Sequence, residues 1–595
     1  MSTETQPVAL KFRPGLYRQS TRYGEEGGWY DCDRVRFRDG KPENMRGRTR
    51  YSNAALMGTG RAILSWTQLD GNNNVAVGTE CRLYLNQGTA NYDITPIRAS
   101  VAYTSVANTS VGSTLVLVSA ANHGCADGDH ILVSSATTIG GNVFLSGEYT
   151  VSVINSNSYY VTYVSAAAAT SAAAGNFSVD YELACGLSIT MAGIGWGTGT
   201  WGTGTWGTPR TSGIQLYLRT WSLDKWGEDL IANVRSGGIY VWDATNGAST
   251  RAVLISAAPT ICGSVLITEE QRHMMALGCT DDSGVFDPNL VRWSDTENYN
   301  SWIATVSNAA GDFRIASGSQ IVGGLRSKGQ IIIWTDVNAH ACRFVGQPFI
   351  FSFQDLADNC GLVGQHAAID SAGVVYWMST NNFFKYDGAV RQIPCAIQKD
   401  IFKDINLTQR LKIFCGSNSE FNEVIWLYCS ASSDEIDRYA VYNYKDDCWY
   451  WGSTTLTTWD DSYVFGNILG TIPDSYIWNV EPVDVYTDDG GVYDSYIQSA
   501  DFDAGDGDFL MFADRFVPDF RLSTGGQVTF QVQGKVWPND TSYVTKGPYN
   551  VSSATRFVRT RLRAREMNIR IGCSVTATAW GIGNLRMDIG KDGQR

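Results

Sequence analysis

Short apolar stretches alternate with polar and glycine-rich turns along most of this chain, and one such unit recurs. It joins a short apolar strand to an aromatic-rich strand that ends in a turn, as in CRLYLNQG at Cys81–Gly88 and GGIYVWDATNG at Gly237–Gly247. Residues at the same phase of the unit are Leu85, Trp242, Trp293, Phe344, Tyr386 and Asn443. After the first interval, their spacings are about 51, 51, 42 and 57 residues.

A period near fifty residues, built of strands and turns, is typical of a β-propeller. Alternation gives each strand one apolar face, which a single unit cannot bury by itself. We therefore predict an all-β chain with a propeller of about six blades over Lys11–Ala99 and Ser212–Pro482. Residues 1–99 hold the N-terminal segment and the first blade, and residues 212–482 hold the remaining blades. The alternative is a generic array of β-sandwiches, in which such echoes arise by chance. The only helical periodicity lies in Ala396–Phe414.

The first interval of the repeat is much longer than the others. From Leu85 to Trp242 it covers about 157 residues, so about one hundred residues are additional. Residues 100–179 predict a separate small β-sandwich or barrel, because β-prone runs such as STLVLVSA and EYTVSVI are separated by turn signals. The tail of this module, SAAAATSAAAG, is interpreted as a low-complexity linker.

Residues 180–211 form a second additional part, a linker loop rich in glycine and tryptophan. Trp196, Trp201 and Trp206 are separated by Gly and Thr in GIGWGTGTWGTGTWGTPRT. One interpretation is a linker whose indoles pack on the protein's own surface. The other is a loop that docks on a neighbouring subunit or another partner.

The repeat breaks near residue 483, and residues 483–595 predict a C-terminal β-sandwich. The runs QVTFQVQ and RFVRTRLRA alternate as antiparallel strands with one wet face do. In the second run, alternation places on one face Arg559, Arg561, Arg563 and Arg565. The first three are candidate interface residues. A solvated face or a salt-bridged subunit contact is favoured over DNA binding.

The net charge of −13 argues against a protein that grips nucleic acid by its phosphates. The thirteen cysteines include no CxxC pair, and no Cys/His cluster has zinc spacing. Buried free thiols, and folding in a reducing compartment, are the interpretation for cysteines inside apolar runs, namely Cys81, Cys262, Cys342 and Cys429. The N-terminus carries no signal-peptide pattern, and no apolar run predicts membrane insertion.

No catalytic motif is visible. The chain has no G-x-S-x-G, Walker A or H-E-x-x-H run, and its five histidines are interpreted as structural or surface residues. The acidic run at Asp501–Phe509 invites a calcium interpretation, but Phe512 stands where an EF-hand requires an acidic ligand. A tight turn is favoured there. We assign no catalytic residue, no cofactor and no metal, and we expect no enzyme.

Several segments resemble a known family. They include RPGLYRQSTRYGEEGGWYDCDRVRFRDG near the start, LRTWSLDKWGEDLIANVRSGGIYVWD at Leu218–Asp243, and GDGDFLMFADRFVPDF at Gly505–Phe520. These segments are similar to the tail nozzle proteins of short-tailed bacteriophages, also called tail tubular protein B or phage stabilisation protein. The resemblance covers nearly the whole chain, and its motifs are structural.

The resemblance implies a structural protein of the virion tail, assembled in the host cytoplasm. It implies a propeller body with a platform-like β domain, and a hexameric ring below the tail adaptor protein. Such a ring continues and gates the DNA channel, and it carries tail fibres or a needle. Double-stranded DNA then passes the lumen without specific binding, so we expect acidic residues to outnumber basic ones there.

The alternative function is a receptor-binding or glycan-processing propeller of the same virion. Clustered indoles stack on sugars, and scattered carboxylates supply catalysis. Such an enzyme requires two carboxylates about 5–10 Å apart in a closed pocket.

Overall fold

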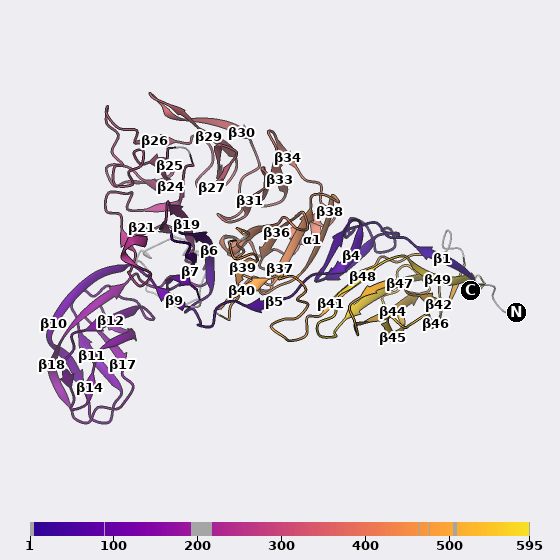
Figure 1. Cartoon of the computed structure of the whole chain (residues 1–595), viewed down its shortest axis with the longest axis horizontal. Helices are drawn as coiled ribbons and strands as arrows, with labels where there is room; N and C mark the ends of the chain where they lie inside the picture. Colours follow the sequence, from indigo (N-terminus) through magenta and orange to yellow (C-terminus); the bar gives the residue numbers. More distant parts are fainter. Residues whose placement is uncertain are drawn as a thin grey trace, which may run out of the picture.

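The computed structural model describes residues 5–88, 90–191, 217–269, 271–462, 464–474, 476–503 and 509–593. The molecule is elongated, with a propeller body, an inserted module at one end and a C-terminal part at the other (Figure 1). Nearly all of its elements are strands. None of the described helices has the length and hydropathy to cross a membrane.

Six antiparallel sheets of four consecutive strands form the propeller. Blade 1 comprises β6 (Gly60–Thr67), β7 (Asn73–Thr79), β8 (Leu83–Gln87) and β9 (Ala90–Asp93). Blade 2 comprises β19 (Trp221–Trp226), β20 (Asp229–Val234), β21 (Ile239–Trp242) and β22 (Val253–Leu254). Blade 3 comprises β23 (Cys262–Ile267), β24 (Met274–Thr280), β25 (Phe286–Trp293) and β26 (Gly311–Arg314).

The remaining three blades follow in chain order. Blade 4 comprises β27 (Ile321–Ser327), β28 (Gln330–Thr335), β29 (Ala339–Gly346) and β30 (Ile350–Ala357). Blade 5 comprises β31 (Ala368–Ser371), β32 (Val374–Met378), β33 (Phe383–Tyr386) and β34 (Val390–Gln392). Blade 6 comprises β35 (Phe414–Asn418), β36 (Glu423–Tyr428), β37 (Arg438–Asn443) and β38 (Cys448–Ser453). The predicted all-β propeller of about six blades is confirmed.

The repeat seen in the sequence corresponds to one strand of each blade. All six phase residues lie in third strands, β8, β21, β25, β29, β33 and β37. The first strands contact one another from blade to blade, β6 with β19, then β23, β27, β31 and β35. Each blade therefore covers the apolar face of the next.

Aromatic residues fill the spaces between blades. The indoles of Trp334 and Trp377, on blades 4 and 5, have ring centroids 5.5 Å apart. Between blades 1 and 2, Trp221 donates a hydrogen bond to the Thr79 carbonyl at 2.6 Å. Gly78 is required beside it, because a Cβ there would lie 2.4 Å from the Trp221 ring. Large buried indoles on first and second strands therefore pack the joints between blades.

Side-chain contacts join the first blade to the last. Arg61 of β6 forms an ion pair with Glu435, in the loop between β36 and β37, at 2.7 Å. Lys412 contacts the same carboxylate at 2.9 Å. Burial opposes ionisation of Glu435, but hydrogen bonds and charges from Arg61 and Lys412 outweigh it and lower the pKa to about 2. The ion pairs of Glu435 with Arg61 and Lys412 therefore help to close the propeller between its first and last blades.

The segment before the propeller pairs with the C-terminal part, so the prediction that the first blade begins at Lys11 is wrong. Strand β1 (Gln6–Leu10) pairs with β49 (Leu585–Lys591), and β2 (Trp29–Asp33) pairs with β41 (Ser495–Ser499). Strands β3 (Val35–Arg38) and β4 (Lys41–Asn44) share a sheet with β48 (Trp580–Ile582) and β43 (Phe520–Leu522). Strand β5 (Arg48–Arg50) joins β39 (Ile468–Thr471) and β40 (Ile477–Val480). Alternation within a strand carries no information about its distant partner.

The C-terminal part is built of two facing sheets. One has the order β1-β49-β42-β46 and the other β2-β41-β47-β44-β45. The strands not yet given are β42 (Met511–Val517), β44 (Gln527–Lys535), β45 (Val544–Ser552), β46 (Val558–Ala564) and β47 (Glu566–Cys573). Phe516 of β42 stacks on Phe530 of β44 with ring centroids 3.7 Å apart. The two inner faces thus form one sandwich core.

Arg36 of β3 links this part to the propeller. Its guanidinium donates two hydrogen bonds of 2.9 Å to Glu423 of blade 6, and it contacts Glu481, after β40, at 2.6 Å. All three side chains are buried. Tyr450 donates a hydrogen bond to Glu423, and Phe421 lies 3.6 Å below the guanidinium. Because all three charged groups are removed from water, each is stabilised only by its buried partners of opposite charge.

The inserted module is a seven-stranded sheet with its own core, between blades 1 and 2. Its long strands β10 (Ile97–Thr109) and β18 (Ser171–Glu182) run antiparallel from the propeller. The others are β11 (Leu115–Ser119), β12 (His130–Ser134), β15 (Gly147–Thr150), β16 (Ser152–Asn155) and β17 (Ser158–Thr162), with a small hairpin of β13 (Thr138–Ile139) and β14 (Val143–Phe144). The linker interpretation of SAAAATSAAAG is wrong, because residues 171–175 of it belong to β18.

The predicted helical stretch becomes two short helices. These are α1 (Gln398–Asp404) and the 3-10 helix η2 (Leu407–Lys412), separated by Ile405 in extended conformation. A further 3-10 turn, η1, spans Ala244–Asn246.

Replacing Arg36 with Ala should destabilise the protein by about 3–5 kcal/mol, because it leaves two carboxylates buried without their cation. The midpoint and slope of urea unfolding, followed by tryptophan fluorescence, measure the effect. Arg314, paired with Asp287 at 2.6 Å but largely exposed, is the matched control. Arg314→Ala should cost at most about 1 kcal/mol. Equal losses in the two variants would contradict the role of the buried cluster.

Removing the module should leave a folded propeller. Ser100 and Asp180 are cross-strand neighbours, so an Asn-Gly turn in place of residues 101–179 closes the chain without stretching it. We expect soluble protein with a cooperative thermal transition and an unchanged near-ultraviolet circular dichroism signal from the blade indoles. Insoluble protein or a non-cooperative melt would show that the module is part of the propeller's folding unit.

Candidate functional site

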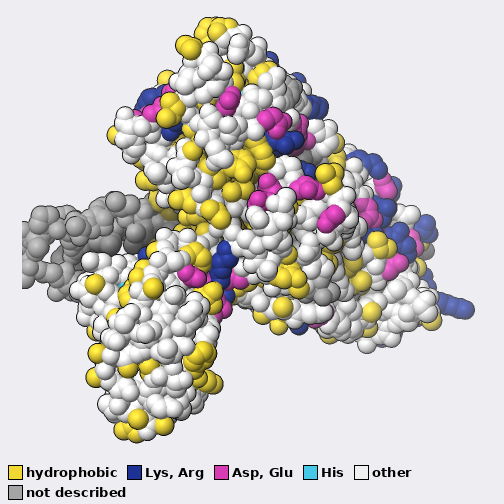
Figure 2. All heavy atoms as spheres, turned by 60° about the vertical axis from the view of Figure 1, so that its left-hand side comes forward, with side chains coloured by type: hydrophobic (Ala, Val, Ile, Leu, Met, Phe, Trp, Pro, Cys, Tyr) yellow, Lys and Arg dark blue, Asp and Glu magenta, His cyan; other side chains and the backbone are white. Residues whose placement is uncertain are grey.

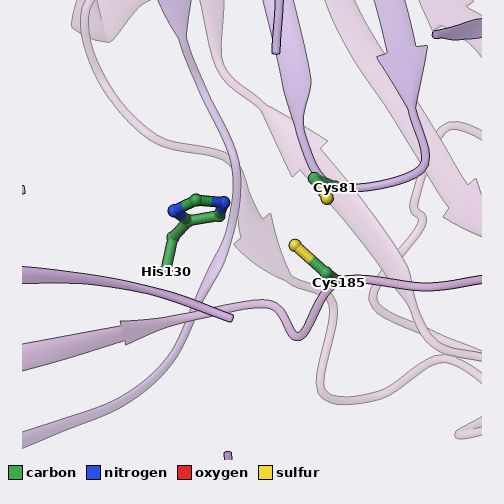
Figure 3. Close-up of side chains that lie close together, drawn as sticks. All are labelled: Cys81, His130 and Cys185. Atoms are coloured by element: carbon green, nitrogen blue, oxygen red, sulfur yellow. The ribbon is translucent and has the colours of Figure 1, made fainter. Parts of the chain in front are cut away.

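Three side chains with metal-binding or nucleophilic chemistry meet where the module joins the propeller. Cys81 lies in the turn between β7 and β8 of blade 1, His130 begins β12 of the module, and Cys185 follows β18 on the way back to blade 2. Their ligand atoms all lie within 4.8 Å of one another. Figure 3 shows the two sulfurs facing each other, with the imidazole beside them. His130 is buried, and both cysteines are partly buried.

Local hydrogen bonds place each of these residues. The Thr79 hydroxyl accepts the N–H of Cys81 at 3.3 Å and so tightens the β7–β8 turn. His130 is fixed by strand pairing, opposite Thr150 of β15. The N–H of Cys185 donates to Asp129 Oδ1 at 2.8 Å. The site is therefore assembled from a turn, a strand end and a connecting segment.

The pKa values of the two thiols are pushed apart. A hydrogen bond with Cys185, and after it contacts with His130, lower the pKa of the Cys81 thiol to about 5 although burial opposes this. The same pairing with Cys81, together with burial, raises the pKa of Cys185. Cys81 therefore has thiolate character at neutral pH.

Beside this site, a group of charged side chains fastens the module to the blades. Arg82 contacts Asp93 of β9 at 3.4 Å and Glu182 of β18 at 3.6 Å, and it also pairs with Glu148 of β15. Arg251 of blade 2 contacts Glu182 at 2.8 Å. Burial, and then the charge of Asp93, raise the pKa of Glu182. Each of these carboxylates has an arginine partner, and we call the group the arginine–carboxylate clamp because its ion pairs join the module to blades 1 and 2.

The predicted interface residues lie elsewhere. Trp196, Trp201 and Trp206 are outside the described residues. On β46, the three predicted arginines alternate with buried residues on an exposed face, at 55%, 69% and 52% side-chain exposure for Arg559, Arg561 and Arg563. Their ion-pair partners are Asp514 for the first two and Asp592 for the third. Arg565 does not share this face, because it lies beyond β46 and stacks over Trp537.

Sequence reasoning missed the junction site. Cys81 was predicted to be a buried free thiol, like Cys262, Cys342 and Cys429. The other three are buried, but Cys81 is partly exposed and faces a second cysteine and a histidine. Its partners lie in distant stretches of sequence, so no ligand spacing signals the site. Cys81 and Cys185 lie before and after the insertion in the sequence, and this flanking position was the available clue.

A glycan-processing enzyme would need two carboxylates that face a sugar in one pocket. Glu423 and Glu481 lie on the same guanidinium, but both are buried. Burial raises the pKa of Glu423 despite Arg36, and the charge of Glu481 adds to this effect. A cavity of about 30 Å³ between blades 3 and 4 is lined by one carboxylate, Glu269. Neither place offers two carboxylates to a sugar.

No family model and no curated protein matches the sequence. Among solved structures, the chain is similar to BBS1N in complex with ARL6DN, soaked with mercury, at 11% identity and a TM-score of 0.25, covering 64% of this chain and 94% of that chain. It is also similar to the phage phi92 endosialidase at 10% identity and a TM-score of 0.18, covering 72% of this chain and 64% of that chain. At these TM-scores neither likeness bears on the function.

Iodoacetamide should label Cys81 faster than Cys125 at pH 7 in reduced, chelator-treated protein. Both thiols are partly buried, but the pKa of Cys125 is raised to about 11, mainly by burial, so it is almost entirely protonated. Peptide mass spectrometry over a pH series gives the two rates. The Cys81 rate should level off above pH 6, and His130→Ala should move that plateau to higher pH. Parallel pH profiles for the two cysteines would contradict the assigned shift.

Proposed function

We propose that this chain is a structural protein of a bacteriophage virion, the tail nozzle of a short-tailed phage. The proposal rests on the resemblance of several segments to that family. The architecture supports it, because a propeller body joined to a C-terminal β-sandwich is the arrangement that the resemblance implies. In the proposed assembly, a ring of subunits continues the DNA channel below the tail adaptor protein and carries fibres or a needle.

The structural observation that favours assembly with another subunit is a set of exposed apolar side chains on the third and fourth strands and adjoining loops of blades 2–4, called here the apolar rim: Val253, Leu254, Val285, Phe286, Ile303, Val306, Phe313, Val345 and Phe349. Phe349 is 76% exposed and Val285 62%. Figure 2 shows hydrophobic side chains gathered over the propeller face that is turned toward the viewer. Apolar side chains gathered on a monomer surface mark a protein contact. A subunit that packs side by side in a ring buries this rim.

The outer strands of these blades add a second reason. Among the described residues, strands β22, β26 and β30 are the outer strands of their sheets. An edge strand presents unpaired backbone groups that a neighbouring chain is able to pair. The net charge of −13 suits the proposed channel, because an acidic wall does not hold DNA phosphates.

The native mass of the purified chain, alone and mixed with its tail adaptor protein, tests the proposal. We expect a closed ring with a central lumen, visible by electron microscopy, and a larger complex with the adaptor. A chain that stays monomeric in both conditions would refute the nozzle role. A ring whose lumen is net positive would refute the proposed passage of DNA without binding.

The paired substitution Phe286→Ser and Phe349→Ser should weaken ring formation at least tenfold in subunit concentration. Each removes an exposed apolar side chain that assembly buries, worth about 1.5–3 kcal/mol when fully buried. Mass photometry across a dilution series measures the shift. Val164 in the module and Val544 in β45, also exposed, are the matched controls for Ser substitution. If the controls weaken the ring as much as the rim variant, the rim is not the contact.

A further inference from the structure

The junction between module and propeller gathers a donor set that suits a soft divalent metal ion. Two thiol sulfurs and one imidazole lie within 4.8 Å of one another. In a tetrahedral zinc site, Zn–S bonds of about 2.3 Å place two sulfurs roughly 3.8 Å apart. The observed upper limit of 4.8 Å between ligand atoms is compatible with a filled site. Thiolate and imidazole are the donors that zinc prefers.

The surrounding groups orient the donors as the outer shell of a metal site does. His130 Nδ1 lies 3.4 Å from the Thr150 hydroxyl, which leaves the other ring nitrogen for a ligand. Asp129 holds the backbone of Cys185. Arg219 donates to the carbonyl of Ala184, the residue before Cys185, at 2.7 Å. Such partners fix the imidazole ring and the segment that carries Cys185.

A structural disulfide explains less of this arrangement. It needs only the two cysteines, whereas a buried histidine stands at the same point. All thirteen cysteines of the chain are free thiols in the structure. The neighbouring group of Asp93, Glu148 and Glu182 is a poorer metal site, because Arg82 and Arg251 already neutralise it.

We propose that Cys81, His130 and Cys185 bind one zinc ion, which fastens the inserted module to blade 1. The three ligands come from blade 1, the module and the segment that leaves the module, so the ion ties the module and its exit segment to blade 1. Three protein ligands would leave the fourth position of a tetrahedral zinc ion for another donor, such as water. Binding adds to the stability of the docked arrangement, because the ligands converge only when the module is seated. The site does not depend on the nozzle role.

The test uses the full chain, reduced, stripped with a chelator and then titrated with Zn²⁺ or Co²⁺. We expect one equivalent to bind, with a thiolate-to-cobalt charge-transfer band and the visible bands of tetrahedral Co²⁺. Zinc should also protect Cys81 and Cys185 from alkylation. A correctly folded wild-type chain that takes up neither metal overturns the proposal, whatever the variants do.

Variants assign the ligands. Cys81→Ser, Cys185→Ser and His130→Ala should each weaken zinc binding at least tenfold, and Cys125→Ser with His123→Ala, a Cys/His pair of the same module, should not. Hydrogen exchange near residues 97–99 and 182–186 should be faster without zinc in the wild type only. Binding that survives loss of Cys81 and Cys185 overturns the assignment. A Cys81–Cys185 disulfide that forms in air, with no zinc uptake after reduction, also overturns it.

Discussion

The buried guanidinium of Arg36 is the constraint on which the arrangement of this chain depends. It lies between Glu423 of the last blade and Glu481 beyond that blade. Both carboxylates are buried, so water cannot take the place of the guanidinium. Arg36 itself belongs to β3, whose sheet includes the C-terminal strands β43 and β48. Propeller and sandwich are therefore joined through a segment that lies near the start of the chain. Removing one charge leaves the others buried and uncompensated, which is why the join has one geometry.

A small number of polar contacts also closes the propeller and attaches the inserted module. Blade 1 meets blade 6 through Arg61 and Glu435, far apart in sequence but 2.7 Å apart in space. The module enters and leaves through two paired strands, so it disturbs neither blade beside it. A few side chains at the junction attach it to the propeller. They belong to the arginine–carboxylate clamp and to the site of Cys81, His130 and Cys185. A zinc ion there would make the module's position depend on metal, and not only on charge.

The two proposals concern different surfaces. The apolar rim of blades 2–4 is an outward face suited to another subunit, while the junction site lies between parts of one chain. A subunit that must keep its shape within a ring gains from internal ties that do not use its outer surface. The basic face of β46 is a third surface, on which Arg559 and Arg563 already have acidic partners. Its exposed charge suits a solvated face or a neighbouring protein.

The sequence by itself determined the all-β class and the propeller. Its repeat marks the third strand of every blade, because alternation reports which side chains are buried and the period reports each return of the chain. It also predicted the alternating arginines of β46. Only the tertiary structure decided the partners of strands β1–β5, the closure between Arg61 and Glu435, and the meeting of Cys81, His130 and Cys185. Local alternation is the same for any partner, so pairing across hundreds of residues is decided by the packing of the whole chain.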